Sequence, residues 1–481
     1  MAKTTHTVDL CIIGAGSGGL SIAAGAAQLG RSVVLFERGE MGGDCLNSGC
    51  VPSKAMIAAG KHAQAFRTGE PFGVKAAEPE VDFKAMQKHI QDVIATIAPV
   101  DSQERFEGFG CTVIRESAGF TGPNQVESDS HIVKAKRYII ATGSVAGAPP
   151  IPGLSDVKYL TNETIFELKK QPKTLMIIGA GPIGLELGQA MQRMGTQVHI
   201  VDIAAPLGRN EPEHAKVLVE ALEAEGVIFH TPAKTKKISQ KASKITIEFE
   251  DREPLTGDAL LVAAGRKPVT DGLGLDTAGI DVHKRGHIET DECLRTSNKR
   301  VYAVGDVSGR GGLTHAAGYH ASVIIKAFYF LPPGIARWKG KATTGRMPAA
   351  IYSQPELANI GMSEAEAIDK YGKDKVRCVS WDYEENDRAI AERHTHGGVK
   401  LVATKGGKLL GASIVGPNAG ELIHVVSLAM TNGVKISGLT GMISPYPTRG
   451  EAIKRAASSW YTDALFGPKG HFMAKLMSRF H

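Results

Sequence analysis

Two segments of the chain repeat the same order of apolar and turn-forming residues. Residues 8–39 read VDLCIIGAGSGGLSIAAGAAQLGRSVVLFERG, and residues 174–204 read TLMIIGAGPIGLELGQAMQRMGTQVHIVDIA. In each, an apolar run leads into a glycine-rich turn, then into apolar residues at helical spacing, then into a second apolar run. The pattern therefore predicts strand, turn, helix and strand twice in one chain.

The two turns share the spacing G-x-G-x-x-G, and an acid follows 23 residues after each first glycine. The first glycine makes the turn, the second lets a pyrophosphate touch the backbone, and the third lets helix pack on strand. The acid is placed to accept hydrogen bonds from ribose hydroxyls. These positions are Gly14, Gly16, Gly19 and Glu37 in the first unit, and Gly179, Gly181, Gly184 and Asp202 in the second.

Two dinucleotide sites in one chain indicate a bound flavin, FAD, and an exchangeable nicotinamide nucleotide. An acid at the second site would repel a 2′-phosphate, so Asp202 favours NADH over NADPH. Arg209 is a candidate 2′-phosphate ligand and leaves NADPH open. A third short strand, RVYAVGDVSG, ends in Asp306, which is either a turn acid or an acceptor for a flavin ribityl hydroxyl.

Two of the 6 cysteines, Cys45 and Cys50, lie close together in GGDCLNSGC. On a continuous helix such a pair would be about 8–9 Å apart at Cα, whereas a disulfide needs less than about 7 Å. The first part is therefore predicted to be a loop with a helix from Pro52, which leaves Cys45 the freer sulfur and Cys50 just before a helix N-terminus. There the dipole would stabilise a thiolate. A reducible disulfide explains the pair; a structural disulfide and two free thiols remain alternatives.

A zinc site is disfavoured, because there is no second cysteine pair and no histidine at finger spacing. The other four cysteines are isolated.

Composition narrows the class of protein further: 42% hydrophobic and 22% charged residues with net charge +6 do not indicate nucleic-acid binding. No leader pattern or membrane-length apolar run is present, so we expect a cytoplasmic protein of several domains.

The motif GGDCLNSGCVPSKA, the paired glycine turns, YIIATG, VYAVGDV and PAAIYSQPELANIGMSE resemble the pyridine nucleotide–disulfide oxidoreductases. That group includes dihydrolipoamide dehydrogenase, glutathione reductase and mercuric reductase. The resemblance implies an α/β fold with two Rossmann-like dinucleotide-binding domains and a C-terminal α+β dimerisation domain. The implied boundaries are 1–150 and 271–345 for the two parts of the FAD domain, 151–270 for the NAD(P) domain and 346–481 for the dimerisation domain.

The resemblance also implies roles for single residues. Cys45 would attack the substrate, Cys50 would contact the flavin, and Lys54 would pair with Glu186 near it. Alone, Lys54 and Glu186 would be ordinary helix-surface charges, and His315 an ordinary surface histidine. Further implied FAD contacts are Gly43, Asp44, Thr142, Gly143, Asp306, His315 and Ala316, and Gly265 is an implied NAD contact.

One position departs from the family. Its dimerisation domain supplies a His-Pro-Thr-x-x-Glu dyad to the partner's disulfide; here the motif reads Tyr446-Pro447-Thr448-Arg449-Gly450-Glu451. A phenol near pKa 10 shuttles protons poorly at neutral pH, which puts dihydrolipoamide or glutathione turnover in doubt. Tyr446 is otherwise a packing aromatic at the interface. A tyrosine at this position is a resemblance to mercuric reductase, but that enzyme also has a C-terminal cysteine pair, and no cysteine follows Cys378 here. The chain therefore resembles most the mercuric-reductase-like members that do not have this pair.

We therefore expect a homodimer that passes electrons from NADH through FAD to a Cys45–Cys50 disulfide and on to a small disulfide acceptor. Alternatives are dihydrolipoamide dehydrogenase, a mercuric-ion or other metal-ion reductase, and a redox-sensing or membrane-docked partner protein. We expect no bound metal and no nucleic acid. Residues 467–481 form a basic amphipathic tail, which is favoured to dock on its own dimer and alternatively makes a weak membrane-surface contact.

Overall fold

The computed structural model describes residues 2–332, 334–335 and 340–480. Residues 1, 333, 336–339 and 481 belong to three of the predicted domain ranges and lie outside the described residues. The chain divides into two compact units, residues 1–203 with 232–344 and residues 204–231 with 345–481. The four predicted domain ranges stay predictions.

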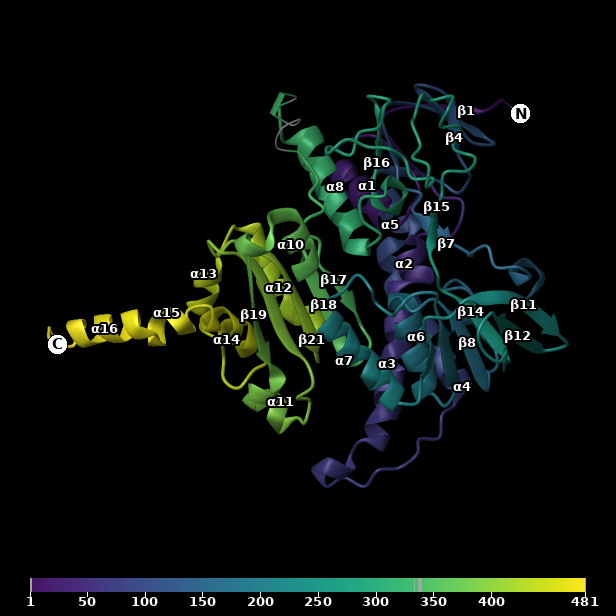
Figure 1. Cartoon of the computed structure of the whole chain (residues 1–481). Coiled ribbons are helices and arrows are strands. Elements are labelled where there is room, and N and C mark those ends of the chain that lie inside the picture. Colours follow the sequence, from purple (N-terminus) through teal and green to yellow (C-terminus); the bar gives the residue numbers. More distant parts are fainter. Residues whose placement is uncertain (1, 333, 336–339, 481) are drawn as a thin grey trace. The chain divides into compact units, whose positions relative to one another are not determined.

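The first unit contains a mixed sheet built on the first glycine turn (Figure 1), in which β5 pairs antiparallel with β4 and β6. β1 pairs in parallel with β2 and β6, and β16 pairs in parallel with β6. The strand order is β3–β2–β1–β6–β5–β4. The strands are β1 (Thr4–Ile13), β2 (Val33–Phe36), β3 (Cys111–Ile114), β4 (Gly119–Gly122), β5 (Gln125–Glu127), β6 (His131–Ile140) and β16 (Val301–Ala303).

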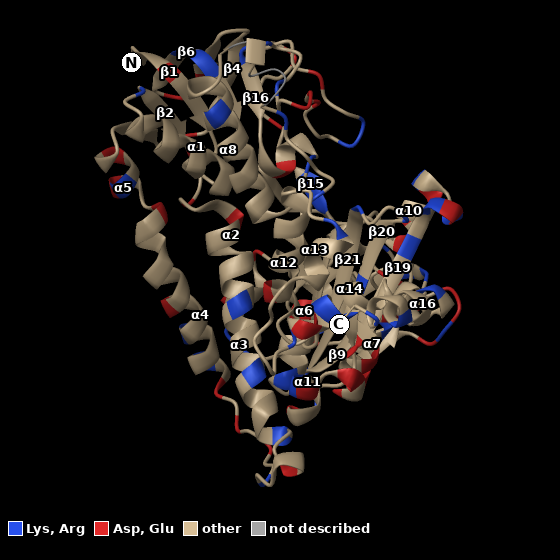
Figure 2. Cartoon of the chain, turned by 90° about the vertical axis from the view of Figure 1, so that its left-hand side faces the viewer, with Lys and Arg blue, Asp and Glu red and all other residues tan. Residues whose placement is uncertain are grey.

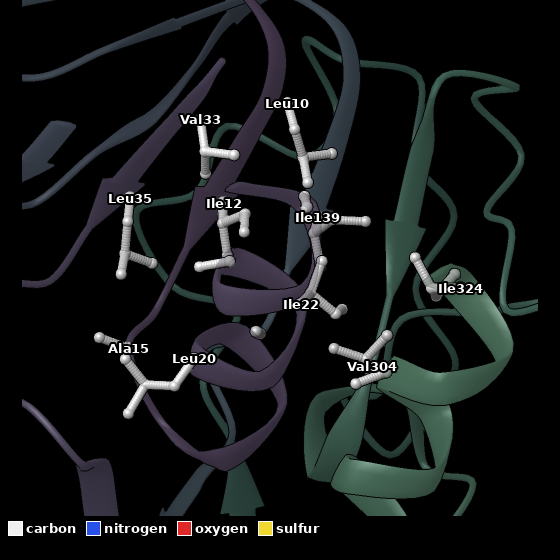
Figure 3. Packing of buried hydrophobic residues seen from close by; sticks show 14 of the residues in the cluster. Leu10, Ile12, Ala15, Leu20, Ile22, Val33, Leu35, Ile139, Val304 and Ile324 are labelled. Carbon is white, nitrogen blue, oxygen red and sulfur yellow. The ribbon is translucent and has the colours of Figure 1, made fainter. Parts of the chain in front are cut away.

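Successive side chains of a strand point to opposite faces of the sheet. Both faces of this sheet are covered, so both sets of side chains are buried. Leu10 and Ile12 of β1 pack with helices α1 and α8, as Figure 3 shows, while Cys11 and Ile13 pack into the opposite cluster. The helices of this part of the unit are α1 (Ser17–Gln28), α2 (Gly43–Asn47), α3 (Cys50–Arg67), α4 (Phe83–Ile97), α5 (Gln103–Gly108) and α8 (Thr314–Tyr329).

The second glycine turn lies in another parallel sheet of the same unit. β8 pairs in parallel with β9 and with β14, and α6 follows β8. The predicted order of strand, turn, helix and strand is thus confirmed for both segments. The elements are β8 (Thr174–Ile178), α6 (Pro182–Arg193), β9 (Gln197–Val201) and β14 (Ala259–Val262), with small antiparallel sheets made by β11 (Thr235–Lys241), β12 (Lys244–Phe249) and β13 (Leu255–Gly257), and by β7 (Ser144–Ala146) and β15 (Arg266–Pro268).

The second unit is built on an antiparallel sheet in the order β17–β18–β21–β20–β19. The sequence VKLVATKGGKLLGASIVG predicts a hairpin with a Gly-Gly turn, and the apolar pattern from Gly420 to Met430 predicts a helix. The pairing of β20 with β21 confirms the hairpin, and α12 confirms the helix. The strands are β17 (Ala349–Ile351), β18 (Glu356–Gly361), β19 (Val376–Asp382), β20 (Gly398–Thr404) and β21 (Leu409–Gly416), and this unit also includes β10 (Ile228–His230). The helices are α7 (Pro212–Ala224), α10 (Glu364–Tyr371), α11 (Asp387–Ala391), α12 (Ala419–Thr431), α13 (Ile436–Thr440), α14 (Glu451–Ser459), α15 (Thr462–Phe466) and α16 (Pro468–Met477).

A buried ion cluster joins α7 and α10 to this sheet. The Lys400 ammonium of β20 lies 2.7 Å from a carboxylate oxygen of Glu211, 2.6 Å from one of Glu213 and 2.7 Å from one of Glu364. Lys400 and Glu211 are almost fully buried, so each charge depends on the other for compensation. No helix in the described part of the chain is long and apolar enough to cross a membrane.

Candidate active site

In the first glycine turn, only the middle of the three glycines has space beside its backbone. Gly14 has φ +105°, and a Cβ on Gly19 would lie 1.9 Å from the Gly14 carbonyl oxygen, so neither position accepts a side chain. By contrast, a Cβ on Gly16 would approach nothing closer than 4.0 Å. Glu37 accepts a hydrogen bond from the Ala15 N–H at 2.7 Å, which ties the end of β2 to the turn.

The second turn repeats this geometry. Gly179 has φ +117°, and a Cβ on Gly184 would lie 2.0 Å from the Gly179 carbonyl oxygen. The middle position, Gly181, has no atom within 4 Å of an added Cβ. Asp202 accepts from the Ala180 N–H at 2.7 Å. Both turns are therefore tight at their outer glycines and open at the middle one, where a pyrophosphate would lie against a helix N-terminus, and the residues fit two dinucleotides.

The cysteine segment differs from the predicted loop. Residues Gly43–Asn47 form the short helix α2, the chain breaks at Ser48 and Gly49, and α3 begins at Cys50. The predicted start at Pro52 was two residues late, because the first N–H groups of a helix have no intrahelical partner and a proline fits there without loss. The prediction that the pair does not share one continuous helix is confirmed.

Both cysteines are free thiols in the structure, and they hydrogen-bond to each other. The bond from Cys45 lowers the pKa of Cys50 to about 6, with further help from Thr314 and Lys54. The same bond, together with burial, raises the pKa of Cys45. The pair is therefore arranged as a Cys45 thiol donating to a Cys50 thiolate.

The expectation that Cys45 is the freer sulfur was wrong for this chain. Cys45 is partly buried within α2, whereas Cys50 is exposed at the start of α3. The cause is the unpredicted helix, which turns the Cys45 thiol toward Ser17 and Thr314. Thr314, the first residue of α8, also has its hydroxyl oxygen 3.2 Å from the Cys50 sulfur.

The structure brings Lys54 and Glu186 together across α3 and α6. The ammonium lies 2.8 Å from the carboxylate, and Glu186 is buried. The two helices approach closely because a Cβ on Gly60 would already be 3.3 Å from the backbone of Ala190. The pair therefore fixes a positive charge one helical turn after Cys50.

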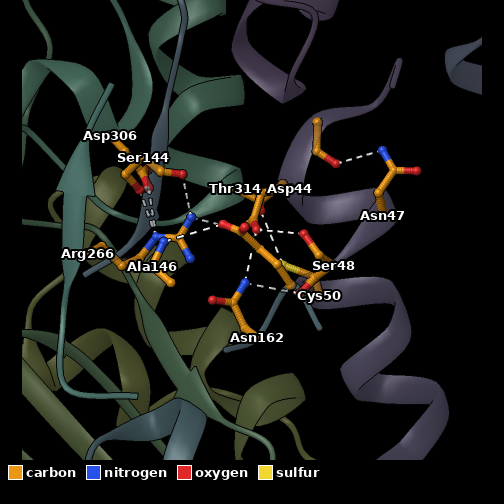
Figure 4. A network of polar contacts seen from close by, with 12 residues as sticks. Asp44, Asn47, Ser48, Cys50, Ser144, Ala146, Asn162, Arg266, Asp306 and Thr314 are labelled. Carbon is orange, nitrogen blue, oxygen red and sulfur yellow. Dashed lines mark hydrogen bonds and ion pairs between the residues drawn. The ribbon is translucent and has the colours of Figure 1, made fainter. Parts of the chain in front are cut away.

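A polar network surrounds Asp44, beside Cys45, as Figure 4 shows. Its carboxylate accepts hydrogen bonds from the Ser48 hydroxyl at 2.9 Å, the Asn162 amide at 3.1 Å and the Arg266 guanidinium at 3.0 Å. Arg266 also donates to the Ser144 hydroxyl at 2.7 Å. The cysteine segment is thereby held to β15 and to the loop that contains Asn162.

The remaining predicted FAD and NAD contacts lie in the segments that follow strands or in the first turns of α2 and α8. Ser144 donates to Asp306, and the Thr142 hydroxyl donates to the carbonyl of Val269 at 2.7 Å. A Cβ on Gly43 would lie 2.8 Å from the Gly16 Cα, so the cysteine segment packs directly on the first glycine turn. Gly143 has φ +66°, Gly265 precedes β15 and has open space, and α8 opens with an exposed His315 and a buried Ala316.

Tyr446 does not pair with the glutamate of the family motif. Its hydroxyl donates to a carboxylate oxygen of Asp387 at 2.8 Å, whereas Glu451 lies 3.7 Å from the Arg455 guanidinium. The Asp387 carboxylate beside the phenol raises the pKa of Tyr446, with a smaller contribution from Glu451. The expected dyad is thus rearranged, because Asn386 caps α11 and places Asp387 next to the exposed ring.

Residues near the predicted sites that were not among the candidates include Thr314, Arg266 and Asp387. Arg266 had a signal, since a charged residue directly after the apolar run LLVAAG requires a partner. Asn386-Asp387 is a pattern typical of a helix start, but this pattern does not predict a contact between Asp387 and Tyr446. Within the described chain, no group of three or more His, Cys, Asp or Glu residues is arranged to hold a metal ion.

Comparison with known proteins agrees with this geometry. Residues 8–321 match the family described as pyridine nucleotide-disulphide oxidoreductase, and residues 347–457 match the dimerisation domain of that family. The chain is 33% identical to mercuric reductase of Streptomyces lividans, with 95% of this chain and 97% of that protein covered. It is 34% identical to dihydrolipoyl dehydrogenase of Thermus scotoductus, with 95% and 98% covered.

Among solved structures, the HOCl-induced flavoprotein disulfide reductase RclA from Escherichia coli is similar. The TM-score is 0.82 at 25% identity, and the match covers 94% of this chain and 99% of that one. The predicted fold class, with two dinucleotide-binding domains and a dimerisation domain, is confirmed. The chain therefore belongs to the pyridine nucleotide-disulphide oxidoreductases, enzymes that use FAD and NAD(P)H.

Proposed function

We propose that this protein is a homodimeric reductase that passes two electrons from NADH to a Cys45–Cys50 disulfide and then to a small disulfide acceptor. The observation that carries the proposal is the Cys45 thiol of α2 bonded to the Cys50 thiolate at the start of α3, with the Lys54 cation one turn further on. Such a pair is the reduced form of an exchangeable disulfide. The match to the dimerisation domain supports the homodimer.

FAD, when bound, supplies a carrier that takes two electrons from the nicotinamide and delivers them to the disulfide. The open backbone at Gly16 and the acids Glu37 and Asp306 would hold it in the first unit. The corresponding turn at Gly181, with Asp202, would hold the nicotinamide nucleotide. An acid at this second position favours NADH, because it repels the 2′-phosphate of NADPH.

The two cysteines have separate roles in the exchange. Two electrons and one proton convert the disulfide into the Cys45 thiol and the Cys50 thiolate. After Cys45 loses its proton, its sulfur attacks one sulfur of the acceptor, forms a mixed disulfide and releases the first thiolate product. The Cys50 thiolate then attacks the Cys45 sulfur, re-forms the internal disulfide and releases the second thiolate product.

The proton on Cys45 needs an acceptor, since its pKa is raised by its bond to Cys50 and by burial. In the family this task falls to a histidine at the position of Tyr446. Here Asp387 holds the phenol protonated, so the phenol acts as a hydrogen-bond donor and the carboxylate is the group with free acceptor capacity. In the family, the dimerisation domain supplies this group to the disulfide of the other subunit. We therefore assign acceptance of the proton from Cys45 of the partner subunit to Asp387, with Tyr446 orienting the carboxylate.

Metal-ion reduction is a second candidate. The supporting observation is Tyr446 itself, at the position where the resemblance to mercuric reductase lies, together with 33% identity to a mercuric reductase over nearly the whole chain. A similar structure is a Cu(II) complex of a mutant of RclA.

The test is oxidation of NADH and NADPH by the purified FAD-loaded protein against a panel of acceptors. The panel holds lipoamide, glutathione disulfide, other small disulfides, Hg(II), Cu(II), a quinone and oxygen alone. The proposal expects one disulfide to exceed the oxygen background and Cys45→Ser to abolish that excess. Turnover only with a metal ion would favour the second candidate, and turnover that survives Cys45→Ser would exclude both.

Tyr446→His is the matched variant for the acid–base assignment. An imidazole near its reference pKa accepts and returns a proton at neutral pH, so disulfide turnover should rise about tenfold or more. Tyr446→Phe should not raise it. Equal behaviour of the two variants would mean that proton transfer at this position does not limit the exchange.

A further inference from the structure

Within the described chain, no other element buries the segment that follows the core of the second unit. α14 packs Ile453, Ala456 and Ala457 into the sheet, and Trp460 closes that core. Of the described residues after Trp460, none is buried. Figure 1 shows α16 extending away from α14 and β19 of the same unit.

The tail, described over residues 467–480, presents large apolar side chains to water. The face formed by α16 and the turn after it includes residues spaced as on one side of a helix. Their exposed fractions run from 37% for Leu476 to 75% for Phe480. The members of this face are Phe472, Met473, Leu476, Met477 and Phe480. So large a contiguous apolar surface is typical of a surface that contacts a partner or a membrane.

The other side of the tail is basic. His471, Lys475 and Arg479 follow one another at four-residue intervals. No Asp or Glu follows Asp463 in the sequence, and Figure 2 colours the acidic and basic residues for comparison. A second tail would carry the same positive charge and repel this one. We therefore do not expect the two tails of a dimer to pack against each other.

An apolar face beside a side whose charged residues are all basic suits a helix that lies in the plane of an anionic lipid surface. We propose that the tail docks on such a surface, with the apolar face of α16 among the acyl chains and Lys475 and Arg479 at the lipid phosphates. At about 1.5 Å per residue, the helix Pro468–Met477 is about 15 Å long, half of the roughly 30 Å of hydrocarbon that a spanning helix must cross.

The contact is reversible, because one short helix buries little apolar area. Each basic residue near an anionic leaflet strengthens binding about fivefold, and a homodimer would present two tails to the same surface. Docking would leave the Cys45–Cys50 chemistry unchanged and hold the enzyme beside the membrane. The inference does not depend on the identity of the acceptor.

The test is co-sedimentation of the full-length FAD-loaded protein with phosphatidylcholine vesicles that contain either no anionic lipid or about one third phosphatidylglycerol. Binding is expected with the anionic vesicles, and high salt should weaken it. Lys475→Glu/Arg479→Glu should lower it at least thirtyfold, and Phe472→Ser/Leu476→Ser should abolish it. Lys84→Glu/Lys88→Glu, on exposed positions of α4, makes the same change in net charge and should leave binding nearly unchanged.

Light scattering of each variant separates this proposal from the alternative that the tail docks on the dimer. Retained mass with lost vesicle binding supports a lipid-docking tail. The proposal is overturned if the wild-type protein ignores anionic vesicles, or if Phe472→Ser/Leu476→Ser still binds them. It is equally overturned if that variant dissociates into single chains, since the apolar face would then belong to the subunit interface.

Discussion

At the residue scale, the chemistry of this protein depends on which polar group contacts which sulfur or carboxylate. Cys50 becomes acidic because Cys45 donates to it, and Tyr446 keeps its proton because Asp387 accepts it. The bond to Cys50 stabilises its charged thiolate, whereas the bond from Tyr446 stabilises its neutral phenol. Substitutions that keep or remove only that bond therefore test each assignment.

The first prediction concerns the acidity of Cys50. Cys45→Ala removes the donor that lowers the pKa of Cys50 to about 6, whereas Cys45→Ser keeps a hydroxyl donor in its place. Alkylation of Cys50 by iodoacetamide, followed by peptide mass spectrometry, should rise through a midpoint near pH 6 in Cys45→Ser. In Cys45→Ala the midpoint should move to higher pH. Coinciding profiles would show that another group stabilises the thiolate.

The second prediction concerns the phenol of Tyr446. Asp387→Asn removes the negative charge that raises its pKa, so the phenol should ionise at lower pH than in the unchanged protein. Absorbance near 295 nm, taken as the difference between Asp387→Asn and Asp387→Asn/Tyr446→Phe, isolates this one tyrosine. An unshifted titration would contradict the Tyr446–Asp387 pair.

At the element scale, the close approach of helices and strands determines where side chains are tolerated. The outer glycines of each turn lie against backbone, while the middle glycine faces open space. In the second unit, one buried lysine of β20 holds the starts of α7 and α10. Packing and charge compensation thus act at different points of the fold.

The third prediction compares two glycines of the same turn. Gly184→Ala forces a methyl group against the Gly179 carbonyl and should lower the free energy of unfolding by about 2–3 kcal/mol. Gly181→Ala fits without a clash and should leave stability nearly unchanged, while it weakens NADH binding where the pyrophosphate approaches. Thermal unfolding and NADH titration together check both outcomes; equal stability losses would contradict the geometry.

The fourth prediction concerns the buried lysine. Lys400→Met leaves Glu211 buried without a cation and should lower the free energy of unfolding by about 3–5 kcal/mol. Lys405→Met, at an exposed position directly after β20, should change it by less than about 0.5 kcal/mol. Urea unfolding followed by far-ultraviolet circular dichroism measures both. A small loss of stability in Lys400→Met would mean that the carboxylates find other partners.

At the scale of the whole molecule, two dinucleotide units and a dimerisation domain make one enzyme. Under the proposed function, electrons would enter at the glycine turn that is bonded to Asp202 and would leave through the cysteine pair. The choice of nucleotide is therefore a property of one turn, whereas the acceptor depends on the rearranged Tyr446 site. The two specificities should be separable by mutation.

The fifth prediction tests that separation. NADH should be preferred over NADPH by about tenfold or more in kcat/KM, because Asp202 repels a 2′-phosphate. Asp202→Ala should narrow the ratio mainly by improving NADPH, with the order of preference among acceptors unchanged. Steady-state kinetics with both nucleotides and two acceptors measures this. A ratio unaffected by Asp202→Ala would place the selectivity elsewhere, with Arg209 the next residue to test.

Much of the architecture could be predicted from local patterns. The two glycine units, the hairpin of β20 and β21 and the helix α12 follow from spacing over a few residues, and all are present. The short helix α2 was missed, because Asn47-Ser48-Gly49 is turn chemistry and a five-residue helix has almost no periodic signal. Its formation also reversed the expected exposure of the two cysteines.

The sequence by itself determined the paired nucleotide units, the cysteine pair and the replacement of the family histidine by Tyr446, since each is a matter of residue type at short spacing. Tertiary structure alone decided the partners. Arg266 reaches Asp44 over 222 positions of the chain, and Tyr446 reaches Asp387 over 59. Such pairs depend on how strands and helices pack, and local preferences carry no information about which distant side chains that packing brings together.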